Sequence, residues 1–309
     1  MNSNRTFVAM ILLSVSVFLS WMAGLVAAFP LMPTRWVLGP KLFWGLNFAV
    51  GGSLLALGQY EWGGVFVVLT ILLGSFTEFE SRGDTLQSAA ACSILVTLIV
   101  SAGLFGAIYS IYGSEIIQAI KTTFDSTFVS LNEMYNQRFG QELVSEEMVA
   151  AIKMQAPSFV VMGLIVSLVF GLLGESRLLK LSGVRGGPKK FYKLNAFRLH
   201  DVFIWLFIFS LLGSFWQYEN QAVKTVSANV LNVTVLLLFL QGLAVMSKFY
   251  QVFRIGTFWR VFWTVLLIVQ LSMGIVILGL IDYWLDFRGR MLKHAAQLKE
   301  GQKKHSGRK

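Results

Sequence analysis

The chain has 309 residues and a formal net charge of +10, yet only 14% of its residues are charged and 55% are hydrophobic. Soluble domains carry about 25% charged residues, so this composition excludes an ordinary soluble globule. The basic residues gather at 177–198 and 288–309, which is typical of topology signals and contacts with anionic lipid rather than of a nucleic-acid-binding module. We therefore expect the lipid bilayer as a partner and no nucleic acid.

Apolar runs that approach the roughly 20 residues of a membrane span recur along the chain. The first run begins at Phe7 and is longer than the apolar part of a signal peptide, about 7–15 residues. The pattern predicts an all-α, polytopic transmembrane helical bundle with about eight spans. The third and sixth spans are short, and whether they cross completely is left open. The predicted spans are 7–29, 42–59, 63–77, 86–112, 157–174, 202–216, 226–247 and 261–281.

The second predicted span carries small residues at four-residue spacing. Gly45, Ala49 and Ser53 form one such series, and Gly52 and Ala56 form another. Small residues at this spacing let helix backbones approach closely. The pattern indicates either packing between helices or a substrate groove.

A polar segment, 114–156, separates the fourth and fifth spans. It contains six acidic and three basic residues, a net charge of −3, so simple electrostatic docking on anionic lipid is disfavoured. A second short helix is predicted from Ser145, ending before Pro157. The segment could lie on the bilayer, cap the bundle, bind a partner or serve as a connector. Its apolar residues recur every three or four positions, which predicts an amphipathic helix: Ile117, Ile120, Phe124, Phe128, Leu131 and Tyr135.

Lys and Arg residues are equally numerous on the two sides of an eight-span arrangement, so the positive-inside rule does not orient the chain. Eight spans place both termini, segment 114–156 and the cluster 282–290 on one unresolved side, with the basic loop 177–198 opposite. The predicted regions are an N-terminal four-span half (1–112), amphipathic extramembrane helices (113–156), a C-terminal four-span half (157–287) and a basic tail (288–309).

The sequence offers few groups for catalysis. Cys92 is the only cysteine, and the three histidines have no spacing typical of a metal site. No nucleophile–base pattern and no phosphate-binding loop is visible. We expect no enzymatic activity, no cofactor and no bound metal.

Polar side chains stand out in the last two predicted spans. Asn229 and Asn232 are three residues apart and share a helix face, whereas Gln241 points roughly to the opposite side. Amides within lipid need hydrogen-bond partners inside the bundle. They are therefore candidates either for helix–helix contacts or for contacts with a ligand.

The last span ends in a dense polar cluster. Asp282 and Asp286 are four residues apart, and acids at a helix C-terminus oppose the macrodipole. Arg288 and Arg290 could compensate them, with Asp286–Arg290 as an i,i+4 pair, and Trp284 would lie at the interface. The cluster is either an interfacial anchor with internal salt bridges or a contact site for a ligand or partner.

Two motifs carry a family resemblance. The stretch Gln241-Gly242-Leu243-Ala244-Val245 and the ending Gly279-Leu280-x-Asp282-x-Trp284-x-Asp286-Phe287-Arg288 resemble the YybS-like bacterial multi-pass membrane proteins, a domain of unknown function. The resemblance is best over residues 195–290 and includes Asp201-x-x-Ile204-Trp205, although His200 stands where relatives often have proline.

The resemblance implies a bacterial cytoplasmic membrane protein. It further implies a distant similarity to the substrate-capture (S) components of energy-coupling-factor transporters and to the rod-shape protein MreD. The chain is thus expected to be a small-molecule transport or substrate-capture component, with a non-catalytic scaffold of the cell envelope as the alternative. A membrane-protein partner fits either role. The candidate ligand or partner contacts are Asn229, Asn232, Gln241, Asp282, Trp284, Asp286 and Arg288.

Overall fold

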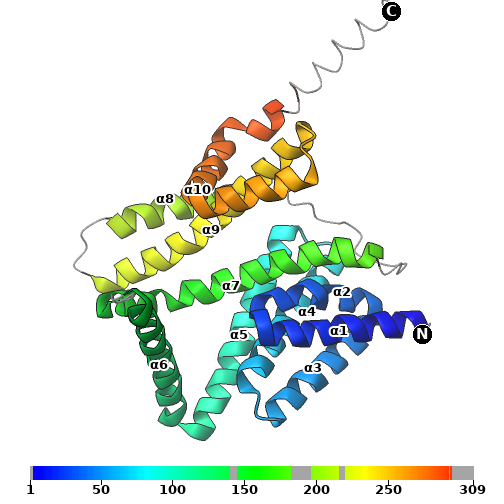
Figure 1. The fold of residues 1–309 in the computed structure, drawn as a ribbon, viewed down its shortest axis with the longest axis vertical. Helices are drawn as coiled ribbons and strands as arrows, with labels where there is room; N and C mark the ends of the chain where they lie inside the picture. Colours follow the sequence, from blue (N-terminus) through cyan, green and yellow to red (C-terminus); the bar gives the residue numbers. More distant parts are fainter. Residues whose placement is uncertain (1–2, 140–144, 182–195, 216–219, 292, 294–309) are drawn as a thin grey trace, which may run out of the picture. The chain divides into compact units, whose positions relative to one another are not determined.

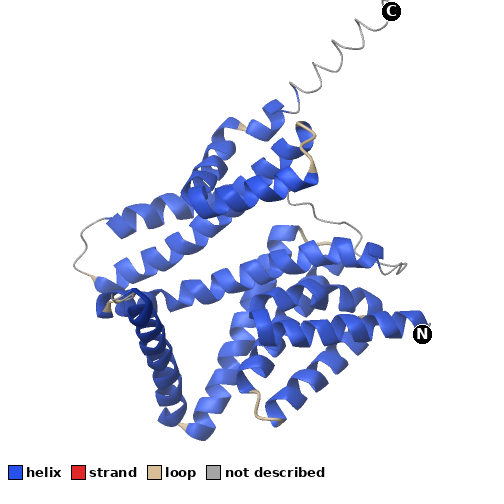
Figure 2. Ribbon diagram, viewed as in Figure 1, coloured by secondary structure: helices blue, strands red, loops and turns tan. Residues whose placement is uncertain are grey.

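The computed structural model describes residues 3–139, 145–181, 196–215, 220–291 and 293. These residues form helices joined by short turns, with no strand among them (Figure 1, Figure 2). Most of the basic loop and of the basic tail lies outside the described residues. Within them, six helical stretches are long and apolar enough to cross a membrane, and Asp201–Phe215 is a shorter apolar helix. The predicted all-α, polytopic membrane bundle is confirmed.

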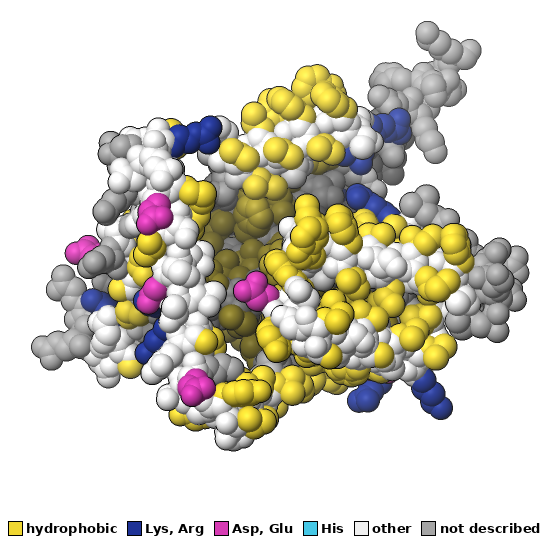
Figure 3. All heavy atoms as spheres, turned by 60° about the horizontal axis from the view of Figure 1, so that its bottom comes forward, with side chains coloured by type: hydrophobic (Ala, Val, Ile, Leu, Met, Phe, Trp, Pro, Cys, Tyr) yellow, Lys and Arg dark blue, Asp and Glu magenta, His cyan; other side chains and the backbone are white. Residues whose placement is uncertain are grey.

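Many large apolar side chains are exposed along the helices, which would be unfavourable in water. Leu95 and Ile99 are 57% and 62% exposed, and Val265 and Val269 are 56% and 72% exposed. Figure 3 shows hydrophobic side chains over much of the face that it views. Soluble monomers rarely carry apolar patches of more than a few hundred Å², so these surfaces belong in lipid.

The chain divides into two compact units, Met1–Phe191 (unit 1) and Tyr192–Lys309 (unit 2). The elements of unit 1 are α1 (Ser3–Ala23), η1 (Gly24–Ala27), α2 (Ala28–Leu38), α3 (Pro40–Ala56), α4 (Tyr60–Arg82), α5 (Leu86–Tyr112), α6 (Ser114–Phe139) and α7 (Glu146–Leu181). Those of unit 2 are α8 (Asp201–Phe215), α9 (Gln221–Val252) and α10 (Thr257–Leu285).

Helix α2 is a short buried helix at the centre of unit 1. It packs against α1, α4 and α7, and nine of its eleven residues are buried. Gly24, at φ 46°, adopts the left-handed conformation that glycine tolerates best, at the turn where the chain leaves α1. The chain then returns along α1 as η1 and α2 (Figure 1).

A proline inside α2 creates a close contact with α7. Pro33 has no N–H, so the carbonyl of Phe29, four residues earlier, lacks its helical donor. That carbonyl faces Gly174 so closely that a Cβ on the glycine would lie 1.9 Å from its oxygen. The glycine therefore lets α2 and α7 pack backbone to backbone.

The return of the chain along α2 corrects the predicted topology. Ala9 and Leu12 near the start of α1 pack in one cluster with Leu38 at the end of α2 and Leu179 at the end of α7. The eight-span count placed the N-terminus opposite both of these ends, and it is wrong here because it treated 33–41 as a loop. The prediction that both termini share one face rested on that count and loses its basis.

The predicted amphipathic helix is α6, but the next helix differs from the prediction. Helix α7 runs without interruption from Glu146 to Leu181, through Pro157, where a helix end was expected. Lys153 of α7 pairs with Asp125 of α6 at 2.7 Å and lies 5.5 Å from the ring centroid of Phe124. Residues 146–156 of the predicted extramembrane segment therefore form one continuous helix with the apolar stretch that follows Pro157.

In unit 2, α9 lies between α8 and α10 and packs against both (Figure 1). Glycines allow the close approach of α9 and α10. A Cβ on Gly242 would lie 2.0 Å from the carbonyl oxygen of Ile275, and one on Gly279 would lie 2.1 Å from that of Leu238. The two helices are in backbone contact at this level, as small residues permit in membranes.

We expect Gly279→Ala to lower the free energy of unfolding by about 1–3 kcal/mol, because the new methyl group meets a backbone carbonyl that cannot rotate away. The measurement is thermal unfolding of the full chain in detergent. Gly274→Ala is the matched control on the same helix, since its nearest neighbour would be a side-chain carbon at 3.7 Å. If Gly279→Ala and Gly274→Ala were equally stable, the backbone contact at Gly279 would not limit the size of the side chain there.

Candidate functional site

Asp282 and Arg288 form a buried clamp at the end of α10. Asp282 is 2% exposed, and its Oδ2 accepts hydrogen bonds from Arg288 Nε at 2.9 Å and Nη2 at 2.8 Å. Its Oδ1 accepts from the backbone N–H of Arg288 at 3.3 Å. The helix ends at Leu285, and Asp286 at φ 44° turns the chain so that residues six apart can meet.

The clamp also holds the segment that precedes α8. Arg288 Nη1 donates to the carbonyl oxygen of Phe197 at 2.5 Å, and Arg198 lies 3.8 Å from Asp286. The hydroxyl of Tyr283 lies close enough to the carboxylate of Asp201, the first residue of α8, for the two groups to interact. The end of α10 and the start of α8 are therefore tied together by side chains of the predicted cluster.

Gln241 bridges the same two parts of unit 2. It is fully buried, its Oε1 accepts from the backbone N–H of Leu199 at 3.0 Å, and its Nε2 donates to the carbonyl oxygen of Gly279 at 3.0 Å. Both ends of the amide are therefore used inside the protein. Buried amides are expected to be satisfied in this way.

The other predicted contacts do not join this group. Asn229 Nδ2 donates to the carbonyl oxygen of Thr225, one turn earlier on α9, at 2.8 Å. Asn229 and Asn232 lie about 18 and 13 Å from Gln241 along the helix axis, at 1.5 Å per residue. Trp284 is 59% exposed and makes an edge contact with Tyr283.

The structure thus unites Gln241, Asp282, Arg288 and Asp286 around residues 197–201, and leaves the two asparagines and Trp284 apart. The contacts of the united residues are internal. A ligand or partner role for any of the seven residues stays a prediction. A concave site lies elsewhere, in unit 1.

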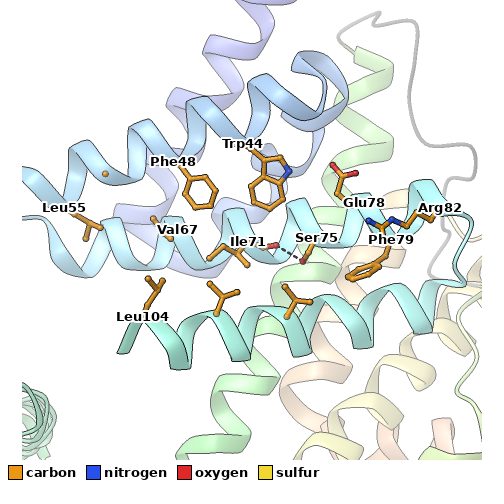
Figure 4. A pocket seen from close by; sticks show the side chains of 13 residues that line it. Trp44, Phe48, Leu55, Val67, Ile71, Ser75, Glu78, Phe79, Arg82 and Leu104 are labelled. Carbon is orange, nitrogen blue, oxygen red and sulfur yellow. Dashed lines mark hydrogen bonds between the residues drawn. The ribbon is translucent and has the colours of Figure 1, made fainter. Parts of the chain in front are cut away.

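A groove of about 720 Å³ lies between α3, α4 and α5. Figure 4 shows Trp44 and Phe48 of α3 on one wall and Leu104 of α5 on another, with α4 between them. Trp44 stacks on Phe48 with ring centroids 5.6 Å apart and rests on Gly74, where a Cβ would lie 2.4 Å from the indole. Most of the remaining wall is aliphatic, and Gly52 leaves open space on the α3 side.

One end of the groove is charged. Glu78 and Arg82 line it beside Phe79, and all three side chains gather at that end in Figure 4. Glu78 accepts a hydrogen bond at 2.6 Å from Nη2 of Arg35, whose side chain is 8% exposed. The guanidinium of Arg82 lies 5.7 Å from the ring centroid of Phe79. The groove therefore has an apolar body and a polar end.

Two further carboxyl groups lie inside unit 1. Glu175 of α7 is 1% exposed and accepts a hydrogen bond from the indole N–H of Trp36. Glu80 of α4 is 9% exposed, and both of its carboxyl oxygens are buried without a hydrogen-bond partner. The described residues contain no group of three or more His, Cys, Asp and Glu side chains that could hold a metal ion.

None of these unit 1 groups was singled out from the sequence, although a signal was present. Arg35 follows Pro33 and Thr34 directly after an apolar run, and Glu175 interrupts another apolar run. Ionisable residues within spans are functional candidates by default. The sequence interpretation assigned residues 33–41 and 78–85 to loops, and so did not count Arg35, Glu78 and Glu80 as groups within spans.

Comparison with known proteins gives one match that covers most of the chain. The model of a family described as Predicted membrane protein (DUF2232) matches residues 6–283. No curated protein and no solved structure matches the chain. The family match extends well beyond residues 195–290, where the resemblance in sequence was best.

Proposed function

Since the chain belongs to this family of membrane proteins, whose description carries no activity, we propose a function from the groove of unit 1. The protein is a non-enzymatic transport or substrate-capture component of a bacterial cytoplasmic membrane. Its ligand is an amphipathic small molecule with an apolar body and an anionic head. The groove between α3, α4 and α5, closed by charge at one end, is the observation that carries this proposal.

The size and lining of the groove support a small-molecule ligand. Its volume of about 720 Å³ falls within the range of about 300–1,000 Å³ for ligand sites, which are mostly apolar with a few fixed polar groups. Trp44 and Phe48 offer flat aromatic surfaces to an apolar body. Gly52, one of the small residues of the predicted stripe, widens the groove instead of packing against a neighbouring helix.

The charges at the end of the groove support an anionic head. Glu78 is already engaged by Arg35, so its negative charge is compensated within the protein. Arg82 brings a second guanidinium to the lining. A carboxylate or phosphate head would find a planar donor there, as guanidinium groups favour such anions. The resemblance to substrate-capture components points in the same direction by fold analogy only.

The test uses Trp44 as an internal reporter in the full chain reconstituted into zwitterionic lipid discs. The probe is a dibrominated stearate, and the signal is the part of the fluorescence that Trp44→Phe removes. We expect saturable quenching by the stearate and weak quenching by a brominated alkylammonium. Gly52→Phe fills the groove and should weaken apparent affinity at least about tenfold, or about 1.4 kcal/mol.

Gly45→Phe is the matched control, because Gly45 lies on the same helix, has open space around it and does not line the groove. It should bind the stearate as the unmodified chain does. Quenching that rises linearly with the probe concentration, and equally in Gly52→Phe and Gly45→Phe, would contradict the proposal. The groove would then be an ordinary lipid-facing surface.

A scaffolding role in the cell envelope is the second candidate, and α6 is the observation that favours it. Several residues of its predicted apolar face remain exposed, with Ile117 at 37%, Ile120 at 51% and Leu131 at 38%. A membrane-protein partner or the bilayer surface could cover this face. Loss of the saturable quenching described above would leave scaffolding as the better supported role.

A further inference from the structure

We propose that Glu80 and Glu175 form a proton-binding site inside unit 1, in which the two carboxyl groups hold an exchangeable proton. The site is separate from the groove, because neither residue lines it. Use of that proton to drive capture or release of a ligand would rest on the proposed function. The proton site itself does not.

The first support is the state of Glu80. Its side chain comes from α4, a helix long and apolar enough to span the membrane, and both carboxyl oxygens are buried without a hydrogen-bond partner. An ionised carboxylate without partners inside a protein costs several kcal/mol, more than a protonated one. The surroundings of Glu80 therefore favour a neutral carboxylic acid.

The second support is the neighbouring acid. Glu175 of α7 lies close enough to Glu80 for the two charges to interact, and the indole N–H of Trp36 occupies one of its oxygens. Two carboxyl groups that share a buried site do not readily ionise together. The Trp36 donor stabilises charge on Glu175, whereas the deeper burial of this residue disfavours it, so either carboxyl group can carry the proton.

Among the residues that the structure describes, no cation from the surrounding elements neutralises the pair. Arg35 of α2 directs its guanidinium to Glu78, and Lys41, Arg177 and Lys180 are exposed at the ends of α3 and α7. Lys153 pairs with Asp125 at the far end of α7. Helix α5, η1 and α1 from Thr6 onward contain no charged residue. On α4 itself, Glu61 lies in the first turn and Arg82 in the last.

Dicyclohexylcarbodiimide tests the proposal, because it is apolar and reacts with protonated carboxyl groups in membranes. The carboxylic proton moves to one carbodiimide nitrogen while the carboxyl oxygen adds to the central carbon. Migration of the acyl group to nitrogen then leaves a stable N-acylurea, so one whole reagent is added and nothing departs. Peptide mass spectrometry of the full chain in lipid discs locates the adduct.

We expect an adduct on Glu80 or Glu175 that declines as the pH of labelling rises, and that the variant at the labelled position, Glu80→Gln or Glu175→Gln, removes. Glu78, paired with Arg35, and the exposed Glu61 should remain unlabelled under the same conditions. Absence of adduct on both Glu80 and Glu175 at the lowest pH at which the chain stays folded would overturn the proposal. Suppression of the adduct by sodium chloride, but not by choline chloride, would replace the proton site with a sodium site.

Infrared spectroscopy of the unmodified chain gives a readout that does not depend on a variant folding. A buried carboxylic acid should give a C=O band that shifts in heavy water and disappears as pH rises. Glu80→Gln and Glu175→Gln should each alter this band, whereas Glu78→Gln should not. The labelling and infrared measurements do not involve the groove. A negative result would therefore contradict the proton site without bearing on the proposed ligand groove, which the stearate experiment tests.

Discussion

Replacing Asp282 with asparagine should lower the free energy of unfolding by about 3–5 kcal/mol. The substitution removes the negative charge that faces Nε and Nη2 of Arg288 and leaves this buried cation without its partner. Chemical or thermal unfolding of the full chain in detergent, followed through tryptophan fluorescence, measures the loss. The effect should appear without any ligand, because the clamp is internal to unit 2.

Asp286→Asn is the control for this prediction. Asp286 belongs to the same motif, but its side chain is 57% exposed and its contact with Arg198 is 3.8 Å long. Exposed ion pairs contribute about 0–1 kcal/mol, so the control should be nearly as stable as the unmodified chain. Equal losses from the two variants would mean that the clamp is not the source of the stability.

Replacing Glu78 with glutamine should lower the free energy of unfolding by about 1–3 kcal/mol, because it leaves the buried Arg35 guanidinium without its anion. The loss should be smaller than for Asp282→Asn, since the Glu78 side chain is 34% exposed. Unfolding of the full chain is again the measurement. The double variant Arg35→Met, Glu78→Gln should recover most of the lost free energy of unfolding. The methionine can be buried at position 35 without a charged partner.

Glu61→Gln is the comparison for Glu78 on the same helix. Glu61 lies exposed in the first turn of α4, and exposed substitutions usually change stability by less than about 0.5 kcal/mol. A double variant as unstable as Glu78→Gln alone would show that the carboxyl group of Glu78, rather than its pairing with Arg35, sustains unit 1.

Hydrophobic runs were sufficient to predict the class of fold, because lipid imposes length and helicity on every segment that crosses it. They failed at α2. Two prolines and an arginine within a few residues are typical of a loop in water, but tertiary burial against α1, α4 and α7 makes them a helix. No local propensity reveals that environment.

The polar cluster at the end of α10 was found from the sequence, but its pairing was not. Helical spacing predicted that Asp286 would pair with Arg290, four residues away. The ion pair that the structure records for Asp286 is with Arg198, 88 positions earlier in the numbering. The left-handed residue that ends the helix redirects the chain, and a contact of this kind depends on tertiary structure that a helical wheel omits.

Helix α7 has a mechanical consequence. Its 36 residues measure about 54 Å at 1.5 Å per residue, whereas the hydrocarbon core is about 30 Å thick. Lys153, which pairs with Asp125 of α6, and the buried Glu175 lie about 33 Å apart on this one helix. A displacement of α6 is therefore transmitted through one continuous helix to the buried carboxyl group of Glu175.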